Sequence, residues 1–362
     1  MKEINQINDK DNNRRNNKTI YGSNNNNDSN DKETKISAVD NVKKIRSTII
    51  IPNYNGIKYI EKCLQSLSGE SAYIVVVDNG STDGSREIVK EKFPQVRLKC
   101  LDRNYGFCTA VNCGIEDSKT IYVILLNNDT EVQPGFVSAL EQAMDKNAGA
   151  FSGGAQMRNL HQPELIDDAG DYYCALGWAF ARGKDKSAVG YQKECRIFAA
   201  CGGAAILRRS ILKRIGGLDE NHFAYLEDID LGYRARIHGY YNIYIPEAVV
   251  YHAGSGASGS RYNRFKVDLT SKNSVYLLYK NMPVMQIILN FPLLLAGFAV
   301  KTLFFMRKGF GRDYLKGLCR GVKLCASGEG RQHKIPYQRK HLRNYIVIQL
   351  ELWRNICYRI CG

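Results

Sequence analysis

Residues 47–85 read STIIIPNYNGIKYIEKCLQSLSGESAYIVVVDNGSTDGS and contain two short apolar runs, 47–52 and 73–78. Both runs are rich in β-branched residues, which is typical of buried strands. Between them, residues 57–67 place apolar side chains at helical spacing, so a helix is expected there. A strand, a helix and a second buried strand in this order predict a parallel βαβ unit.

The same alternation continues along the chain and predicts an α/β fold, with a mostly parallel sheet covered by helices on both faces. The further expected elements are helices over 85–92, 107–117 and 134–146, and strands over 96–101 and 120–126. Residues 148–252 are less regular. They predict a strand over 198–207 with Gly202-Gly203 inside it, a helix over 226–238, and a strand region over 241–252 interrupted by Pro246.

Charge and cysteine usage limit the classes of protein to which the chain can belong. The net charge is +15, and residues 301–362 alone hold fourteen Lys or Arg against three acids. Because the rest is close to neutral, no nucleic-acid partner is expected. The eleven cysteines form no C-x-x-C pair, which argues against a zinc knuckle and favours reduced thiols in a cytoplasmic protein.

The two ends of the chain differ in composition from its middle. Residues 1–44 are rich in Asn and are expected to form a disordered tail, followed by a catalytic domain over 45–265. In the basic C-terminal region, 266–362, the seventeen uncharged residues 284–300 predict a helix about 25 Å long, short for a bilayer core of about 30 Å. We expect this helix to lie in the membrane interface, with residues 284–362 held to anionic lipid on the inner face of the cell membrane. A spanning helix and a buried helix are the alternatives.

Polar clusters follow the predicted strands at 53–55, 78–85 and 127–130. In an open α/β sheet, ligands bind at the carboxyl ends of the strands, so the clusters predict one site. Asp78 could accept hydrogen bonds from a base or a ribose, and a carboxylate at 129 could hold Mg²⁺ or Mn²⁺ with a diphosphate. Turns and helix caps are the structural alternative.

Three acids, Glu227, Asp228 and Asp230, crowd at the start of the helix predicted over 226–238. Adjacent carboxylates raise one another's pKa, which suits a general base. Acids are also favoured at the positive end of any helix, and this alternative accounts for Glu227 and Asp230 equally well.

Seven motifs in a fixed order carry a family resemblance. They are Ile51-Pro-Asn-Tyr-Asn-Gly56, Val77-Asp-Asn-Gly-Ser-Thr-Asp-Gly-Ser85, Arg103-Asn-Tyr-Gly106, Ala110-Val-Asn-Cys-Gly114, Leu126-Asn-Asn-Asp-Thr130, Gly216-Gly-Leu-Asp-Glu220 and Leu226-Glu-Asp-Ile-Asp-Leu231. The series resembles the inverting glycosyltransferases of family 2, particularly their rhamnosyltransferase-like branch with the GT-A fold. The resemblance covers residues 47–252.

This resemblance implies a role for each matching residue. Asp228, with Glu227 beside it, would be the catalytic base, and Asp129 would hold Mn²⁺ or Mg²⁺ with His252 nearby. Nucleotide-sugar contacts are implied for Pro52, Tyr54, Asn55, Asp78, Asn79, Arg103, Asn104, Gly106, Asn112, Asn127 and Asn128. Asn127 stands where the family's D-x-D motif has its first acid, which leaves the strength of the metal dependence open.

The expected activity is transfer of rhamnose or another hexose from a nucleotide-diphosphate sugar to a glycan or lipid-linked acceptor, in polysaccharide biosynthesis of the cell envelope. A sugar nucleotidyltransferase is a weaker alternative, because residues 52–55 lack the cation that such enzymes use for triphosphate. A non-catalytic, membrane-bound binding protein is the other alternative.

Overall fold

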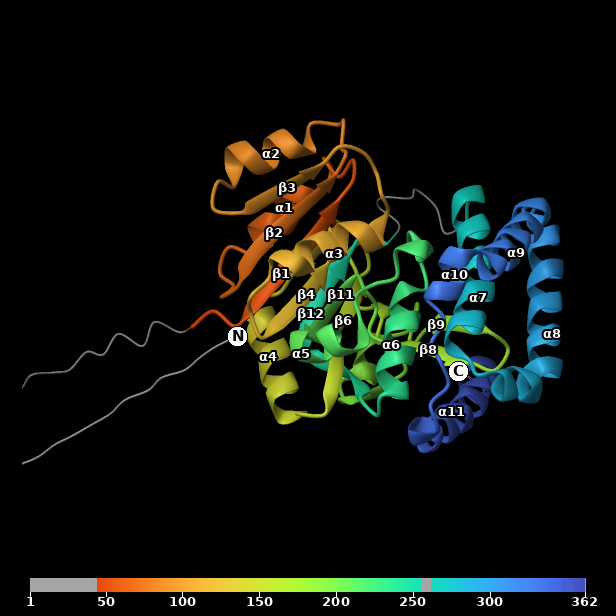
Figure 1. Cartoon of the computed structure of the whole chain (residues 1–362). Coiled ribbons are helices and arrows are strands. Elements are labelled where there is room, and N and C mark those ends of the chain that lie inside the picture. Colours follow the sequence, from red (N-terminus) through yellow and green to blue (C-terminus); the bar gives the residue numbers. More distant parts are fainter. Residues whose placement is uncertain (1–43, 255–261, 362) are drawn as a thin grey trace, which may run out of the picture. The chain divides into compact units, whose positions relative to one another are not determined.

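A computed structural model describes residues 44–254 and 262–361 (Figure 1). The expected disordered tail therefore lies outside the described residues, except for Lys44. The described residues from Lys44 onward form one compact unit.

A mixed sheet lies at the centre of this unit, with strands in the order β10-β12-β6-β11-β4-β1-β2-β3, while β5 pairs with β12 and β7 with β6. The strands are β1 (Ser47–Asn53), β2 (Tyr73–Asn79), β3 (Arg97–Leu101), β4 (Tyr122–Leu126), β5 (Thr130–Val132), β6 (Ala150–Asn159), β7 (Ile166–Asp168), β10 (Cys195–Ile197), β11 (Ala204–Arg208) and β12 (Tyr241–His252). The predicted parallel half is confirmed, since β4, β1, β2 and β3 all run parallel. A separate hairpin pairs β8 (Asp171–Cys174) with β9 (Trp178–Ala181).

Helices cover both faces of the sheet, as predicted, because alternate strand residues point to opposite sides. Ile49 and Ile51 of β1 pack in the core cluster that includes residues of α1 and α4, whereas Ile50 packs in the cluster that includes residues of α3 and α6. The helices of this half are α1 (Ile60–Ser66), α2 (Ser85–Lys92), α3 (Phe107–Asp117), α4 (Phe136–Lys146), α5 (Arg209–Ile215) and α6 (Glu227–Ile237), with 3-10 turns η1 (Ala188–Tyr191) and η2 (Glu220–His222).

Two predicted strands differ from the structure. The strand expected over 198–207 is wrong at its start, because β11 begins at Ala204 and Gly202-Gly203 form a turn before it. An added Cβ at Gly203 would lie 2.9 Å from Met157 Cε, so the backbone packs closely at this turn. The strand region 241–252 is one strand, β12, whose register shifts between Ile245 and Val249 and thereby accommodates Pro246.

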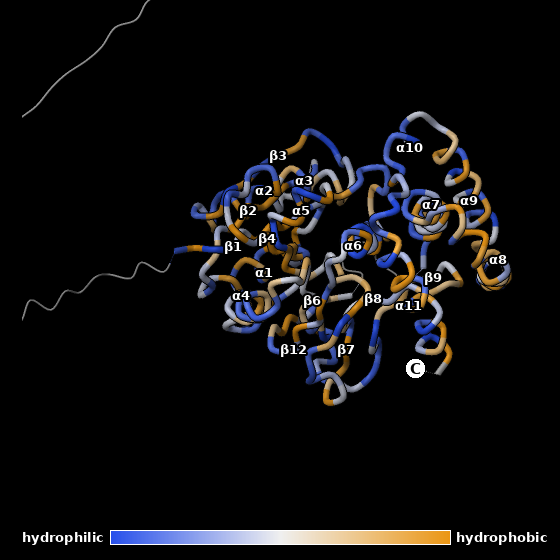
Figure 2. Tube along the Cα trace, turned by 60° about the horizontal axis from the view of Figure 1, so that its bottom comes forward, coloured by the Kyte–Doolittle hydropathy of each residue, from blue (hydrophilic) through white to orange (hydrophobic). Residues whose placement is uncertain are grey.

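The C-terminal helices are α7 (Arg264–Asn281), α8 (Val284–Arg307), α9 (Gly311–Ala326), α10 (Gly328–Gln332) and α11 (Leu342–Cys361), with the 3-10 turn η3 (Arg339–His341). The predicted end of the apolar helix at residue 300 is wrong: α8 has 24 residues and is therefore about 36 Å long. Lys301, the first charged residue after the apolar run, lies within this helix and over the Trp178 ring, at 5.8 Å from its centroid. Among the described residues, α8 is the one helix long and apolar enough to cross a membrane. Figure 2 shows its hydrophobic residues at the edge of the C-terminal helices.

Candidate active site

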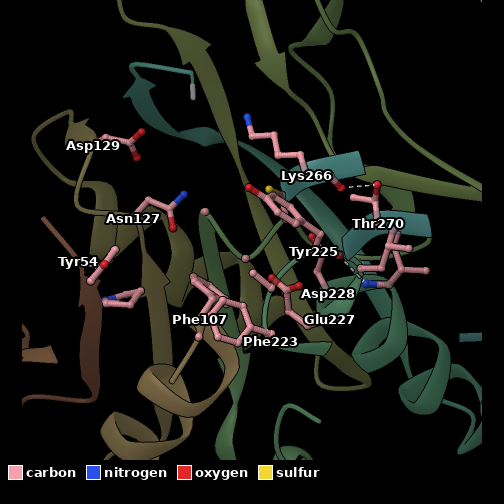
Figure 3. A pocket seen from close by; sticks show the side chains of 18 of the residues that line it. Tyr54, Phe107, Asn127, Asp129, Phe223, Tyr225, Glu227, Asp228, Lys266 and Thr270 are labelled. Atoms are coloured by element: carbon pink, nitrogen blue, oxygen red, sulfur yellow. Dashed lines mark hydrogen bonds between the residues drawn. The ribbon is translucent and has the colours of Figure 1, made fainter. Parts of the chain in front are cut away.

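A cleft of about 810 Å³ opens where β1, β2 and β4 end. Its lining includes Pro52, Tyr54, Asn79, Asn104, Gly106, Asn127, Asn128, Asp129, Glu227, Asp228 and His252. Figure 3 shows Tyr54, Asn127 and Asp129 on one side of this cleft and Glu227 and Asp228 on the other. The structure thus brings most of the predicted site residues together around one cavity.

Four predicted contacts lie outside this lining: Asn55, Asp78, Arg103 and Asn112. The Asn112 amide donates to Leu218 O at 2.8 Å and accepts from Leu218 N at 3.0 Å, which ties α3 to the segment before η2. The Arg103 guanidinium lies 4.7 Å from the centroid of the Tyr105 ring. Asn55 has φ +50° and accepts from Thr82 N at 2.9 Å.

Asp78 is fully buried one layer behind the cleft floor. It pairs with Arg86 at 2.6 Å and accepts from Asn53 Nδ2 at 3.1 Å. Burial alone would raise the pKa of Asp78, but hydrogen bonds from Ser81 and Arg86 lower it below its ordinary value. Asn53 in turn accepts from Asn128 Nδ2 at 2.7 Å, so this ionised carboxylate helps to position the asparagines that line the cleft.

The Asn79 amide fixes the loop that enters α3. It donates to Asn104 Oδ1 and to Gly106 O, both at 3.0 Å, and accepts from Tyr105 N at 2.9 Å. Gly106 has φ +94°, and an added Cβ would lie 2.6 Å from Phe223 O. A glycine is therefore required where this loop meets the segment before α6.

Asp129 and His252 meet at the carboxyl ends of β4 and β12. His252 Nε2 lies 3.2 Å from Asp129 Oδ1, and its Nδ1 lies 2.8 Å from Asp167 Oδ2, with Lys184 paired to Asp167. Burial alone would lower the pKa of His252, but the hydrogen bonds with Asp129 and Asp167 raise it to about 9. The imidazole is therefore a cation between two carboxylates.

Asp129 and His252 also fit a divalent cation. Neighbouring ligands on an octahedron with bonds of about 2.1 Å are about 3.0 Å apart, close to the spacing of Asp129 Oδ1 and His252 Nε2. Asp167 on the second imidazole nitrogen completes the carboxylate–histidine arrangement that orients a ligating histidine. Binding a metal would require His252 to lose its proton.

Glu227 and Asp228 form the first turn of α6, directly after a strained segment. Phe223, Tyr225 and Leu226 all have left-handed backbone conformations, with φ between +65° and +70°. Such conformations are costly for residues with a Cβ and cluster at functional sites. Here the segment turns the chain so that both carboxyls reach the cleft.

The two carboxyls are in different environments. Burial, followed by the charge of Asp228, raises the pKa of Glu227 to about 8, and its Oε2 has no hydrogen-bond partner among the residues that the structure describes. Burial also raises the pKa of Asp228, but hydrogen bonds from the Ile229 and Gly202 amides oppose this effect. Asp228 is therefore the carboxyl that ionises first, with Glu227 protonated beside it at neutral pH. Asp230 is separate from this pair, because it pairs with Arg234 and Lys280 at 2.9 Å each.

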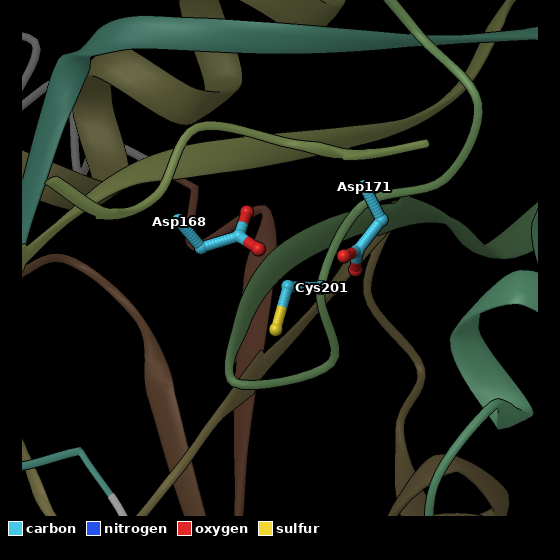
Figure 4. Close-up of side chains that lie close together, drawn as sticks. All are labelled: Asp168, Asp171 and Cys201. Carbon is cyan, nitrogen blue, oxygen red and sulfur yellow. The ribbon is translucent and has the colours of Figure 1, made fainter. Parts of the chain in front are cut away.

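Asp171 of β8 lies behind Asp228 and is a cleft residue that the motifs did not identify. Its carboxyl donates a hydrogen bond to Asp228, because burial and the charge of Asp168 raise the pKa of Asp171 well above the ordinary value. Figure 4 shows Asp168, Asp171 and Cys201 together, with potential ligand atoms within 4.8 Å of one another. This trio is the group of three or more potential metal ligands found among the described residues, and it does not include Asp129.

The far side of the cleft is built by α7 and the segment before it, which the sequence did not indicate. Asn263, Lys266 and Thr270 line the cleft there. Asn263 also caps α7 by accepting from Lys266 N at 2.8 Å. Burial lowers the pKa of Lys266, opposed by the charge of Asp129.

Comparison with known proteins decides the family. Residues 48–216 match the profile of the family described as Glycosyl transferase family 2. The chain therefore carries a family 2 glycosyltransferase domain. It is similar to the N-acetylglucosaminyl-diphospho-decaprenol L-rhamnosyltransferase of Mycobacterium tuberculosis, with 29% identity over 238 residues, 58% of this chain and 77% of that protein.

Other similarities are shorter or more distant. Glycosyltransferase AglE of Haloferax volcanii is 31% identical over 114 residues, covering 29% of this chain and 35% of AglE. The solved structure of GalNAc-T7 with UDP, GalNAc and Mn²⁺ superimposes with a TM-score of 0.50 at 17% identity, over 65% of this chain and 47% of that one. This last similarity concerns the fold alone and agrees with the predicted GT-A architecture.

Proposed function

We propose that this enzyme inverts the anomeric configuration of a hexose, rhamnose being the first candidate, as it moves the sugar from a nucleotide-diphosphate donor to an acceptor hydroxyl. The observation that carries the proposal is the placement of Asp129 and Asp228 in one cleft, from opposite sides. The similarity to a rhamnosyltransferase supports the choice of sugar. By the same similarity, the acceptor is lipid-linked through a diphosphate.

Asp228 acts as the base in this mechanism. Its carboxylate takes the proton of the acceptor hydroxyl while that oxygen forms a bond to the anomeric carbon. The bond from this carbon to the diphosphate oxygen breaks, and its electron pair leaves with the nucleoside diphosphate. Protonated Glu227 cannot compete as a second base, and Asp171 holds Asp228 in place through its hydrogen bond.

The donor binds at the strand ends. Tyr54 is 44% exposed and offers its ring to the base, while Asn79 and Asn104 hold the loop around the nucleotide. A divalent cation, Mn²⁺ or Mg²⁺, held by Asp129 and His252 would neutralise charge on the leaving diphosphate. The Lys266 side chain, on the side of the cleft that α7 builds, provides a further positive charge.

The substitution Asp228→Asn tests the assignment of the base. Removing a general base lowers the rate by about 10²–10⁴-fold, whereas donor affinity should stay within twofold, because the donor is held at the strand ends. Asp117→Asn, in the last turn of α3 and outside the cleft, is the matched control. Transfer and donor hydrolysis are measured with and without acceptor. Retained transfer by Asp228→Asn refutes the assignment, and donor binding with neither reaction in the wild type would identify a binding protein.

We also propose that α8 lies in the interface of the inner face of the membrane, with the active site in the cytoplasm. Its exposed apolar side chains recur at helical spacing, as at Ile288, Phe291 and Leu295, each about 60% exposed. The opposite face is covered, since Trp178 Nε1 donates to Gly297 O at 3.1 Å. One covered face favours a helix lying on the membrane over one spanning it.

The helix proposal is tested by sedimentation with lipid vesicles. Ile288→Glu with Leu295→Glu should reduce binding to vesicles of mixed neutral and anionic lipid at least tenfold. Lys62→Glu, at an exposed position of α1 and outside the basic C-terminal region, makes the same change of charge and is the control. Unchanged vesicle binding by the double variant would refute the interfacial position of α8.

A further inference from the structure

A second cavity, of about 940 Å³, lies on the other side of β9 from the acid pair. It is strongly cationic. Its lining holds a single acid, Asp185, and six cations: Arg182, Lys184, Lys186, Arg196, Arg354 and Arg359. None of the motifs that identify the family falls in this cavity, and the donor site does not use these cations.

Three of the guanidiniums carry uncompensated charge. Among residues 44–254 and 262–361, Arg182, Arg196 and Arg359 make no ion pair with a carboxylate. Each lies over an aromatic ring instead: Arg182 at 4.7 Å from the Tyr191 centroid and Arg359 at 5.8 Å from that of Phe180, both rings of the cavity wall, and Arg196 at 4.3 Å from the centroid of Tyr241, outside the lining. Stacked guanidiniums keep their N–H donors available for an anion.

Ring contacts and hydrogen bonds hold the walls of the cavity together. Tyr172 stacks on Tyr358 of α11 at 5.4 Å and meets the Phe180 ring edge-on at 5.7 Å. Backbone and side-chain hydrogen bonds join α11 to the hairpin, since Ala175 N donates to Leu352 O at 3.0 Å and Asn355 Nδ2 to Tyr173 O at 2.9 Å. The cations are therefore presented by a preformed frame, which reduces the entropic cost of binding.

The hairpin joins this cavity to the active-site cleft. Ala179, Phe180 and Ala181 of β9 line both cavities. Ala181 lies opposite Asp171 in the β8–β9 pair, and the Asp171 carboxyl is hydrogen-bonded to Asp228. At its other end, the hairpin contacts the apolar helix α8 through Trp178.

From this geometry we infer that the second cavity binds the phosphate or diphosphate group of the acceptor. The inference rests on the proposed function, because it assumes a lipid-linked acceptor. Arginine guanidiniums bind phosphate oxygens in bidentate pairs, and three of them suit the charge of a diphosphate. With its diphosphate held there, the acceptor would extend its sugar past β9 to Glu227 and Asp228. Its lipid would lie on the side of the hairpin that contacts α8.

Binding of farnesyl diphosphate to the full-length protein tests the inference directly. The titration is run in EDTA, so that metal-dependent binding at the donor site does not contribute. Arg196→Glu with Arg359→Glu should raise the Kd at least tenfold, because two exposed cations become anions. Arg339→Glu with Lys340→Glu in η3 makes the same change of charge elsewhere and should stay within twofold. Equal Kd values for the cavity variant and the wild type would overturn the inference.

Three further measurements sharpen the outcome. Farnesol, which lacks the anion, should bind at least tenfold more weakly than farnesyl diphosphate, and equal binding would overturn the inference. Binding of inorganic diphosphate distinguishes the two possible sources of the bound anion. If it binds as tightly as farnesyl diphosphate, the natural ligand of the cavity is a free phosphoanion. If it binds more weakly, the ligand is the lipid-linked diphosphate. Arg196→Gln with Arg359→Gln, checked by its thermal midpoint, guards against loss of folding and should raise the Kd in the same direction.

Transfer assays separate this inference from the proposed function. In the charge-reversal variant the acceptor KM should rise at least tenfold, while donor Kd stays unchanged. A protein that binds farnesyl diphosphate through these arginines but transfers no sugar would refute the proposed function and leave the anion site standing. A normal acceptor KM in an active variant would refute the acceptor role of the cavity.

Discussion

The substitution Lys280→Met should destabilise the enzyme through the carboxylates it leaves behind. Lys280 is 3% exposed, and its Nζ lies 2.7 Å from Asp219 Oδ2 and 2.9 Å from Asp230 Oδ2. Removing one member of a buried ion pair costs about 3–5 kcal/mol. Each acid keeps another donor, Arg234 for Asp230 and Tyr276 for Asp219. We therefore expect about 3 kcal/mol, the lower end, and a fall in Tm of about 5 °C.

Urea unfolding and thermal scans measure this loss. Lys323→Met removes an exposed lysine from α9 and should change the free energy of unfolding by less than about 0.5 kcal/mol. Adding Asp219→Asn to Lys280→Met should recover about 1 kcal/mol or more, because one unpaired charge is removed. If Lys280→Met unfolds within about 0.5 kcal/mol of the wild type, the reasoning about this charge network is wrong.

Three other predictions concern the active-site cleft. Burial raises the pKa of Asp228, so kcat/KM should rise with pH as this carboxyl loses its proton. Glu227→Gln should leave this limb where it is, because Glu227 is still protonated and uncharged while Asp228 ionises; a limb that moves to lower pH would contradict the assignment. Gly106→Ala should raise the donor Kd at least tenfold in calorimetry, because the added Cβ would clash with Phe223 O. An unchanged Kd would show that the loop shifts to accommodate the methyl group and that glycine is not required there. EDTA should weaken nucleotide binding by the wild type but not by Asp129→Ala; a response in that variant would place the metal elsewhere.

The first half of the fold could be predicted from local sequence, since the buried strands β1, β2 and β4 are mostly apolar runs and each is followed by a polar cluster. β2 and α3 lie within one residue of their expected bounds. The cluster after β4 supplies Asn127, Asn128 and Asp129 to the cleft, because parallel strands end at the same edge.

The rest of the cleft depends on contacts between distant segments. Asp171 lies on a four-residue strand with no periodic pattern around it, and it reaches the cleft only because β8 pairs with β9. Lys266 and Thr270 come from α7, which carries no motif of the family. The uncharged run ends before Lys301, so the sequence predicts too short an α8; in the structure the Trp178 ring covers this lysine, and burial lowers its pKa to about 8.

The left-handed residues before the acid pair combine backbone strain with packing. Leu226→Gly would relieve a conformation that costs a residue with a Cβ about 1–2 kcal/mol. It would also remove a side chain that packs against the hydrophobic core, and it would give the unfolded chain more freedom, so the relief brings no net gain in heat resistance. The two carboxyls that follow would sample more orientations and react more slowly, so a bulky residue at this bend serves both the core and the reaction.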